Sequence, residues 1–294
     1  MKEVRLMSGK DMNKGIVKQN IDAVFHNTDG NYVTESMTED PDLVGVPLFD
    51  EPLAGFASAH DPLFREYKKP EVIGPWFMAP EEWLPNAESV VSIFLPFSDA
   101  VKQSNRVSDK VPSQLWLLGR VEGQAFIAKF AGALRDMFQG HGISACAPGI
   151  DPRFRAIKGG KGMSGFPEIN EQTYGSNWSE RHAAYAAGLG TFGLSKGLIT
   201  RRGMAGRFTS LILSDTLEPD SRPYTGIYDY CIMCGACIHR CPADAITMEN
   251  GKDHTVCGPW LSRTAELYSP RFGCGKCQTG VPCESGIPGE EKSR

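Results

Sequence analysis

The stretch CIMCGACIHRCP, residues 231–242, places four cysteines within eleven positions and ends in a proline. Of the nine cysteines in the chain, eight follow residue 230 and only Cys146 precedes it. Where the cell keeps cysteine reduced, thiols clustered in this way usually hold metal or carry out redox chemistry. The C-terminal part of the chain is therefore predicted to be a separate metal-binding unit.

The four cysteines have the spacing C-x2-C-x2-C-x3-C and are followed by proline. In bacterial ferredoxins this run places three thiolates on one 4Fe-4S cluster and the fourth on a second cluster. A second set of cysteines must therefore exist, and the later C-x2-C pair and its neighbours supply it. Zinc sites also use C-x2-C pairs, so two zinc sites are the alternative. We predict two 4Fe-4S clusters, one held by Cys231, Cys234, Cys237 and Cys283 and the other by Cys241, Cys257, Cys274 and Cys277.

Length and charge set the class of protein. The 294 residues, 41% of them hydrophobic, can bury a core that suits one large domain or two unequal ones. A formal net charge of -4 gives no overall field that would attract nucleic acid, which is therefore not an expected partner. The N-terminus lacks the apolar core of a secretory signal, and no stretch approaches the roughly 18 apolar residues of a spanning helix. We expect a cytoplasmic protein without membrane contact.

A run rich in proline, glycine and polar residues, LEPDSRPYTG at 217–226, precedes the cysteine-rich part. Such residues mark turns and linkers. We therefore place a double-cluster, ferredoxin-like domain over residues 218–294 and a front domain over residues 71–217. Residues 1–70 are rich in acidic and turn residues, and we expect an irregular N-terminal extension with short helices there.

Hydrophobic patterning predicts that the front domain is mixed α/β. SVVSIFLPF at 89–97 and RFTSLILSD at 207–215 are apolar runs of strand length, as expected for buried strands. Apolar residues recur at steps of three and four between Leu118 and Phe138, which predicts a long amphipathic helix ending at Gly140. Strands and helices in this order favour an α/β layer.

A second informative stretch is WSERHAAYAAGLGTFGLSKGLITRRG, residues 178–203. It predicts a helix that ends at Gly188, followed by a glycine-rich loop whose backbone amides can approach a bound group closely. The same glycines are compatible with a helix cap and ordinary turns. The stretch does not meet the dinucleotide-binding fingerprint, because no predicted strand leads into Gly188.

The segments AAGLGTFGLSKGLI and SLILSD, followed by the double cysteine set, resemble the cobalamin-dependent epoxyqueuosine reductases and their relatives, the reductive dehalogenases. The resemblance covers roughly residues 88–283. It implies a nitroreductase-like α+β domain that carries base-off cobalamin and a small ferredoxin-like domain that passes electrons to cobalt. The D-x-H-x-x-G pattern of cobalamin proteins with a histidine on cobalt is absent, in agreement with a base-off cofactor.

The resemblance also implies site residues. SER at 179–181 matches a Glu-Arg pair of the family, which makes Glu180 and Arg181 candidate substrate or cofactor contacts; ordinary solvated helical charges are the alternative. Cys146 is either a small buried hydrophobic residue or a thiol near cobalt, and we place it in the pocket because its neighbours match the catalytic segment. The predicted cofactor-binding residues are Cys146, Ala187, Gly188, Leu189, Gly190, Thr191, Gly193, Lys196 and Thr200.

The proton donor is the main departure from the family. ACAP at 145–148 matches the segment that carries an aspartate in epoxyqueuosine reductases, and here Ala145 takes that position. The resemblance identifies residues 149–178, which follow, as an insertion that the epoxyqueuosine reductases lack. We interpret this insertion as a lid or as a source of other acids. Tyr174 is our first choice of donor because dehalogenases use a tyrosine, and Asp151 and His182 are the other candidates.

Three functions agree with these features. The first is a cobalamin-dependent reductase that acts on a small electrophilic substrate other than epoxyqueuosine. The second is a reductive activator that passes electrons to a separate corrinoid protein, and the third is a flavin-binding, ferredoxin-fused reductase. We favour the first, with a small-molecule substrate and a low-potential electron donor such as ferredoxin or flavodoxin as partners.

Overall fold

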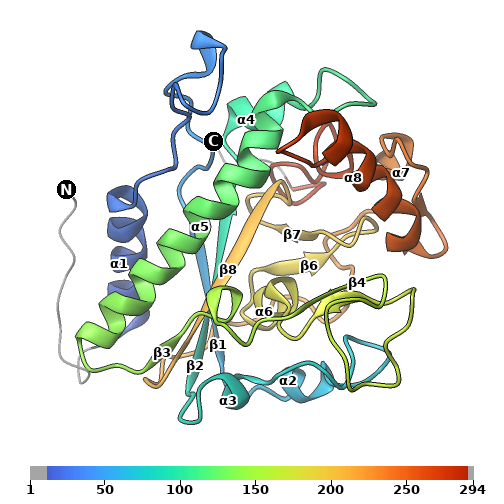
Figure 1. The fold of residues 1–294 in the computed structure, drawn as a ribbon. Coiled ribbons are helices and arrows are strands. Elements are labelled where there is room, and N and C mark those ends of the chain that lie inside the picture. Colours follow the sequence, from blue (N-terminus) through green and yellow to red (C-terminus); the bar gives the residue numbers. More distant parts are fainter. Residues whose placement is uncertain (1–11, 291–294) are drawn as a thin grey trace.

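The computed structural model describes residues 12–290 and is built around one four-stranded sheet. Its strand order is β1-β2-β8-β3, and every neighbouring pair is antiparallel (Figure 1). The two central strands are those predicted from the apolar runs, and β2 is buried along its whole length. The strands of the sheet are β1 (Leu53–Ser58), β2 (Ser89–Pro96), β8 (Gly206–Leu213) and β3 (Ala145–Cys146).

Helices cover both faces of the sheet (Figure 1). Helix α5 (Gln114–Gly140) packs against β8 and β3 on one face, and α6 (Glu180–Ala186) packs against β1, β2 and β8 on the other. The Ser113 hydroxyl accepts a hydrogen bond from the backbone amide of Trp116 and so caps α5 at its N-terminus. The predicted long helix and its end at Gly140 are confirmed.

The N-terminal segment differs from our expectation of an irregular extension over residues 1–70. Strand β1 forms an edge of the central sheet, and α1 (Lys14–Asn27) buries Val17 and Ile21 in the same hydrophobic core as α5. Residues 1–11 lie outside the described part of the chain. The partner of β1 is β2, more than thirty residues away, and a six-residue run gives no local sign of that pairing.

The cysteine-rich part lies beside one end of the sheet, where it contacts the β6/β7 hairpin (Figure 1). The segment predicted as a linker is held against the front domain: Asp220 receives a hydrogen bond from Lys14 and bonds the backbone of Phe56. The helices and strands of the cysteine-rich part are α7 (Ala236–His239), β9 (Ile246–Thr247), β10 (Gly251–Lys252), α8 (His254–Tyr268) and η3 (Lys276–Gln278).

The insertion at 149–178 forms a β-hairpin, β4 with β5, joined by a long loop. Within residues 12–290 no helix is long and apolar enough to cross a membrane. The fold is mixed α and β, as predicted, with an antiparallel rather than a parallel sheet. The remaining elements are η1 (Pro41–Leu43), α2 (Pro62–Glu66), α3 (Pro80–Trp83), α4 (Asp99–Ser104), η2 (Pro148–Ile150), β4 (Ala156–Lys158), β5 (Tyr174–Ser176), β6 (Gly190–Phe192) and β7 (Leu198–Thr200).

Candidate iron-sulfur and reductive site

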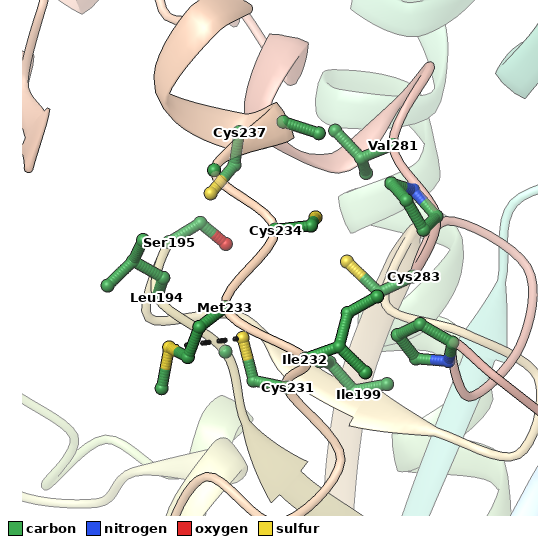
Figure 2. Close-up of a pocket in the computed structure, with 15 residues that line it drawn as sticks. Leu194, Ser195, Ile199, Cys231, Ile232, Met233, Cys234, Cys237, Val281 and Cys283 are labelled. Atoms are coloured by element: carbon green, nitrogen blue, oxygen red, sulfur yellow. Dashed lines mark hydrogen bonds between the residues drawn. The ribbon is translucent and has the colours of Figure 1, made fainter. Parts of the chain in front are cut away.

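Four cysteines, three from one short run and one from about fifty residues later, line one pocket (Figure 2). Three come from the run that opens the cysteine-rich part, and the fourth follows η3. Gly235 has a φ of +72°, which reverses the chain between the second and third cysteine and starts α7. The other lining residues are mostly apolar. The cavity therefore brings together the predicted first set, Cys231, Cys234, Cys237 and Cys283.

The spacing of the sulfurs bears on the choice between iron-sulfur and zinc. A tetrahedral zinc with Zn–S bonds of about 2.3 Å holds its sulfurs about 3.8 Å apart. Among the described residues, no three cysteine sulfurs lie within 4.8 Å of one another. In a cubane each thiolate binds a different iron, so its sulfurs stand farther apart. The wider spacing of the sulfurs fits a 4Fe-4S cluster better than a zinc ion.

The other four cysteines also gather. Burial raises the pKa of Cys257, and the nearby thiol groups of Cys277 and Cys241 raise it further. Burial is the main cause that raises the pKa of Cys274, and the nearby Cys277 and Cys257 thiols raise it further. Cys277 packs in one small hydrophobic cluster with Cys231 and Cys237 of the first set. The two sets are therefore adjacent, as electron transfer between two clusters requires.

Two donors adjoin this second set that the sequence did not single out. The Lys252 ammonium lies 3.5 Å from the sulfur of Cys277, and the interaction raises the pKa of Lys252. Nε1 of Trp260 is buried and has no acceptor among the described residues. The indole lies near Cys274 and offsets part of the rise in the pKa of that thiol that burial causes. Sulfurs of a bound cluster would accept from both groups, so this donor set fits a 4Fe-4S cluster.

The glycine-rich stretch folds differently from the open loop that we expected. After the helix ends, Gly188 adopts a φ of +76°, and residues 190–200 form the β6/β7 hairpin. A Cβ on Gly190 would lie 1.9 Å from the carbonyl oxygen of Ile199, so glycine is required there for strand pairing. The tip of the hairpin, with Gly193, lines the cavity of the first cysteine set.

Most of the predicted cofactor contacts in this stretch have partners within the protein. Thr191 accepts a hydrogen bond from the backbone amide of Tyr230, and the Thr200 hydroxyl donates to the carbonyl oxygen of Gly203. Ala187 and Leu189 are buried in hydrophobic clusters, whereas Lys196 is exposed at the hairpin tip. These contacts account for the residue types at these positions without a cofactor. The role of the residues in cobalamin binding stays a prediction.

Cys146 lies in β3 and is buried in the hydrophobic cluster that contains Trp178 and Ile212. Burial first, and then Asp151, raises the pKa of its thiol to about 12. The sulfur is therefore protonated at neutral pH and packs as a small hydrophobic side chain. The alternative interpretation from the sequence, a buried structural cysteine, accounts for these contacts.

The structure separates the candidate proton donors by environment. Asp151 forms a salt bridge of 2.8 Å with Arg153, whose hydrogen bond is the main reason that the pKa of Asp151 falls to about 2. Burial lowers the pKa of His182 to about 4, and its Nδ1 lies 2.7 Å from the Ser179 hydroxyl. At neutral pH Asp151 is ionised and His182 is neutral, so neither holds a proton that it readily releases.

Tyr174 lies in β5 of the inserted hairpin and stacks on His254 at a ring distance of 5.7 Å. His254 begins α8, so this contact joins the insertion to the cysteine-rich part. A Cβ on Gly258 of α8 would lie 3.1 Å from the Tyr174 hydroxyl. The tyrosine therefore sits at the boundary between the front domain and the cluster region.

Glu180 begins α6 and lies against the segment that in epoxyqueuosine reductases carries the acid. A Cβ on Gly149 would lie 3.2 Å from its Oε1, and its Oε2 is buried without a partner among the described residues. Burial raises the pKa of Glu180 to about 7, against the opposing effect of hydrogen bonds with Ser210 and Trp178. The carboxyl group therefore retains a proton near neutral pH.

Arg181, the neighbour of Glu180, is exposed to solvent, yet surrounding protein desolvates it and lowers its pKa. The thiol of Cys277 opposes the shift, so the second cysteine set faces this arginine. Two further arginines, Arg120 and Arg207, act on the same site and were missed by sequence reasoning, because they lie on elements far apart in the chain.

Comparison with known proteins supports this site. Residues 224–247 match the 4Fe-4S binding domain family. An epoxyqueuosine reductase of Leadbetterella byssophila is 35% identical over 113 residues, 35% of this chain and 36% of that protein. A tetrachloroethene reductive dehalogenase of Desulfitobacterium hafniense is 33% identical over 111 residues, 35% of this chain and 20% of the dehalogenase.

Over about a third of its length the chain is similar to these two groups of reductases, and its cysteine run matches the 4Fe-4S binding domain family. The resemblance inferred from the sequence is thereby confirmed. The crystal structure of an epoxyqueuosine reductase bound to an epoxyqueuosine-modified tRNA stem loop has the same fold, with a TM-score of 0.52 at 18% identity over 93% of this chain and 68% of that one. The chain matches about a third or less of the length of the curated relatives.

Proposed function

We propose that this protein is a cobalamin-dependent iron-sulfur reductase that acts on a small electrophilic substrate. The observation that carries the proposal is that the two cysteine quartets adjoin each other and that the second is coupled to Arg181 of the front domain. Two 4Fe-4S clusters on these quartets would feed electrons, one at a time, to a centre in the nitroreductase-like front domain.

The polar groups of Arg181 and Glu180 could hold cobalamin. Arg181 is exposed without a protein partner among residues 12–290, and the Oε2 atom of Glu180 is buried without one. These groups can hydrogen-bond the amide and phosphate groups at the edge of a corrinoid. Bound there, cobalamin would supply a metal centre that accepts single electrons and reacts with electrophiles.

Within this proposal Glu180 provides the proton. Reductive removal of an oxygen or halogen leaves negative charge on the departing atom, and an acid with a pKa near the working pH is the best donor. Burial keeps Glu180 protonated up to about pH 7. Tyr174, our first choice from the sequence, stays a candidate at the boundary with α8. Asp151 and His182 no longer suit the role.

Electrons would enter through the first cysteine set. Cys234 is exposed, and Ile232 and Met233 beside it are exposed apolar side chains. A low-potential donor such as ferredoxin or flavodoxin can approach this surface closely. The second set, whose buried Cys277 is coupled to Arg181, would then pass electrons to the centre in the front domain.

Cofactor analysis tests the proposal. The protein is purified anaerobically, reconstituted with iron, sulfide and hydroxocobalamin, and separated from free cofactor by gel filtration. We expect about two 4Fe-4S clusters and one corrinoid per chain. Electron paramagnetic resonance of the cob(II)alamin form should show no nitrogen superhyperfine splitting from an axial ligand. Retained flavin, or clusters without any retained corrinoid, would contradict the proposal in favour of the flavin enzyme or the reductive activator.

A further inference from the structure

One residue of the front domain, Asn105, is hydrogen-bonded to the segment 274–283, which carries three of the predicted cluster ligands and which we call the ligand loop. Asn105 follows α4 and is fully buried. Its amide nitrogen donates to the carbonyl oxygen of Cys274 and to the hydroxyl of Thr279, both at 3.1 Å. Its side-chain oxygen accepts from the backbone amide of Ser113 at the start of α5. A single side chain therefore joins two helices of the front domain to the ligand loop.

Lys276 of the ligand loop is fully buried and points its ammonium group at Asn105. The ammonium nitrogen lies 2.8 Å from the backbone carbonyl oxygen of Asn105 and 3.1 Å from its side-chain oxygen. Both acceptors are neutral. Among residues 12–290 no carboxylate forms an ion pair with this ammonium. A buried charge without a counter-charge is unfavourable, so the position of Lys276 calls for a nearby anion.

The second cluster is the anion that this position implies. Lys276 stands between Cys274 and Cys277 in the chain, and both cysteines belong to the second set. Gly275 has a φ of +68°, and a Cβ on it would lie 1.9 Å from the ring of Trp116, so the chain turns tightly here before η3. The two thiols and the lysine therefore share one tight turn. Four thiolates give a 4Fe-4S cluster net negative charge, and reduction adds one more.

We propose that Asn105 is a positioning residue of the second cluster, which holds the buried ammonium of Lys276 where its charge stabilises the reduced state. A fixed positive charge in a poorly solvated place favours the state with more negative charge and so raises the midpoint potential. Because Asn105 belongs to the front domain, the packing of that domain sets the potential of the cluster. The proposal rests on the iron-sulfur part of the proposed function and does not depend on cobalamin or on the substrate.

Redox titration of the reconstituted full chain, followed by electron paramagnetic resonance, tests the charge. Lys276→Met keeps the length of the side chain and should lower one midpoint potential by about 59 mV, a tenfold change in the equilibrium for one electron. Lys276→Gln keeps a donor for Asn105 without the charge and should give the same shift. Lys110→Met, which removes an exposed lysine from the loop after Asn105, is the matched control and should shift neither potential.

Two outcomes overturn the role of Lys276. The first is an unchanged pair of potentials in a Lys276→Met or Lys276→Gln protein that retains about eight iron per chain. The second is loss of about four iron in both variants, because Lys276 would then serve only the folding of the ligand loop.

A double-mutant cycle tests whether Asn105 acts through Lys276. Asn105→Ala should lower the same midpoint potential as Lys276→Met, and it should have no further effect in the Lys276→Met protein. Gln103→Ala alters an exposed side chain of α4 and is the control, for which we expect no shift. If Asn105→Ala loses iron, Asn105→Asp replaces it. The aspartate keeps the acceptor oxygen, neutralises the ammonium and should lower the same midpoint. No shift, or an equal shift with and without Lys276, overturns the role of Asn105.

Lys252 identifies the cluster on which Lys276 acts. The ammonium of Lys252 lies 3.5 Å from the sulfur of Cys277, a thiol of the second set. Lys252→Met and Lys276→Met should therefore lower the same midpoint potential, and shifts of two different midpoints overturn the assignment to the second cluster. The proposed function fails separately. A protein that retains two clusters and no corrinoid, yet shows the shift with Lys276→Met, contradicts the cobalamin reductase and supports the role of Asn105 and Lys276.

Discussion

The ammonium nitrogen of Lys252 lies 3.5 Å from the sulfur of Cys277. Lys252 is placed there by the tight β9/β10 hairpin, which ends directly before α8 and the predicted ligand Cys257. A fixed positive charge beside a cluster stabilises the reduced state, which carries one more negative charge than the oxidised state. The second cluster should therefore have the higher potential that allows it to receive electrons from the first.

Replacing Lys252 should change one potential and not the other. At an effective dielectric of about 20, loss of this charge costs the reduced cluster on the order of 1–3 kcal/mol, or roughly 40–130 mV for one electron. We expect Lys252→Met to lower one midpoint potential by that amount in a redox titration followed by electron paramagnetic resonance. Lys129→Met removes an exposed charge from α5 and should change neither. Equal shifts in both potentials would place Lys252 between the clusters.

The number of clusters can be counted by single substitutions. The protein should bind about eight iron and eight sulfide per chain. Cys234→Ala should remove about four of each, because Cys234 lines the cavity of the first set only. Cys146→Ala, which alters the one cysteine of the front domain, should retain all eight. Stoichiometric zinc after anaerobic purification would disprove the iron-sulfur assignment.

Glu180 should make stability depend on pH. Its pKa is about 7 in the folded protein against 4.5 in the unfolded chain. Between these values the folded state holds the extra proton, so stability is fully present below about pH 4.5 and falls as pH rises through about 7. The full effect is on the order of 3 kcal/mol. Glu180→Gln should therefore stabilise the protein at pH 8 and not at pH 4.5.

Thermal melting at both pH values measures this effect without cofactor or substrate. Glu171→Gln alters an exposed carboxylate of the insertion and is the control, for which we expect the same difference from the unaltered protein at both pH values. If Glu180→Gln behaves like this control, Glu180 is ionised in the fold and cannot be the proposed proton donor.

Local patterns predicted the parts of the fold that are formed by neighbouring residues. The strands β2 and β8 and the end of α5 at Gly140 followed from apolar runs and periodicity. The ferredoxin spacing predicted both cysteine sets, and the structure gathers each of them. The glycine hairpin was misjudged as an open loop because a glycine needed for close strand pairing, such as Gly190, has the same sequence signature as one that approaches a ligand.

The electrostatic features of the site could not be predicted, because they arise from contacts between distant segments. The electrostatic coupling of Arg120 and Arg207 to Arg181 arises only when α5, α6 and β8 pack together. The raised pKa of Glu180 likewise depends on burial by the sheet, which the pattern SER does not encode. Sequence reasoning found Glu180 and Arg181 through resemblance alone and gave no reason to connect Arg120 or Arg207 with them.

The side chain of Ala145 explains why a simple substitution should not create an epoxyqueuosine reductase. Ala145 occupies the position of the acid in that family's segment, yet it lies in β3, opposite Leu213, and its side chain belongs to the core under α5. Its exposed fraction is 6%. Cys146 faces the other side of the sheet. An aspartate at 145 would therefore point into the hydrophobic core under α5 and not toward α6 and Glu180.

We expect no conversion of epoxyqueuosine-containing tRNA by the reconstituted protein with a low-potential reductant, as measured by mass spectrometry of the digested nucleosides. Ala145→Asp should not restore activity and should cost about 3–5 kcal/mol of stability, because it buries a carboxylate without a partner. Ser144→Asp adds the same charge at the exposed neighbouring position and should change stability by less than about 0.5 kcal/mol. Conversion by the unaltered protein at a rate similar to that of an authentic epoxyqueuosine reductase would show that Glu180 or Tyr174 serves this reaction and that the insertion admits a tRNA loop.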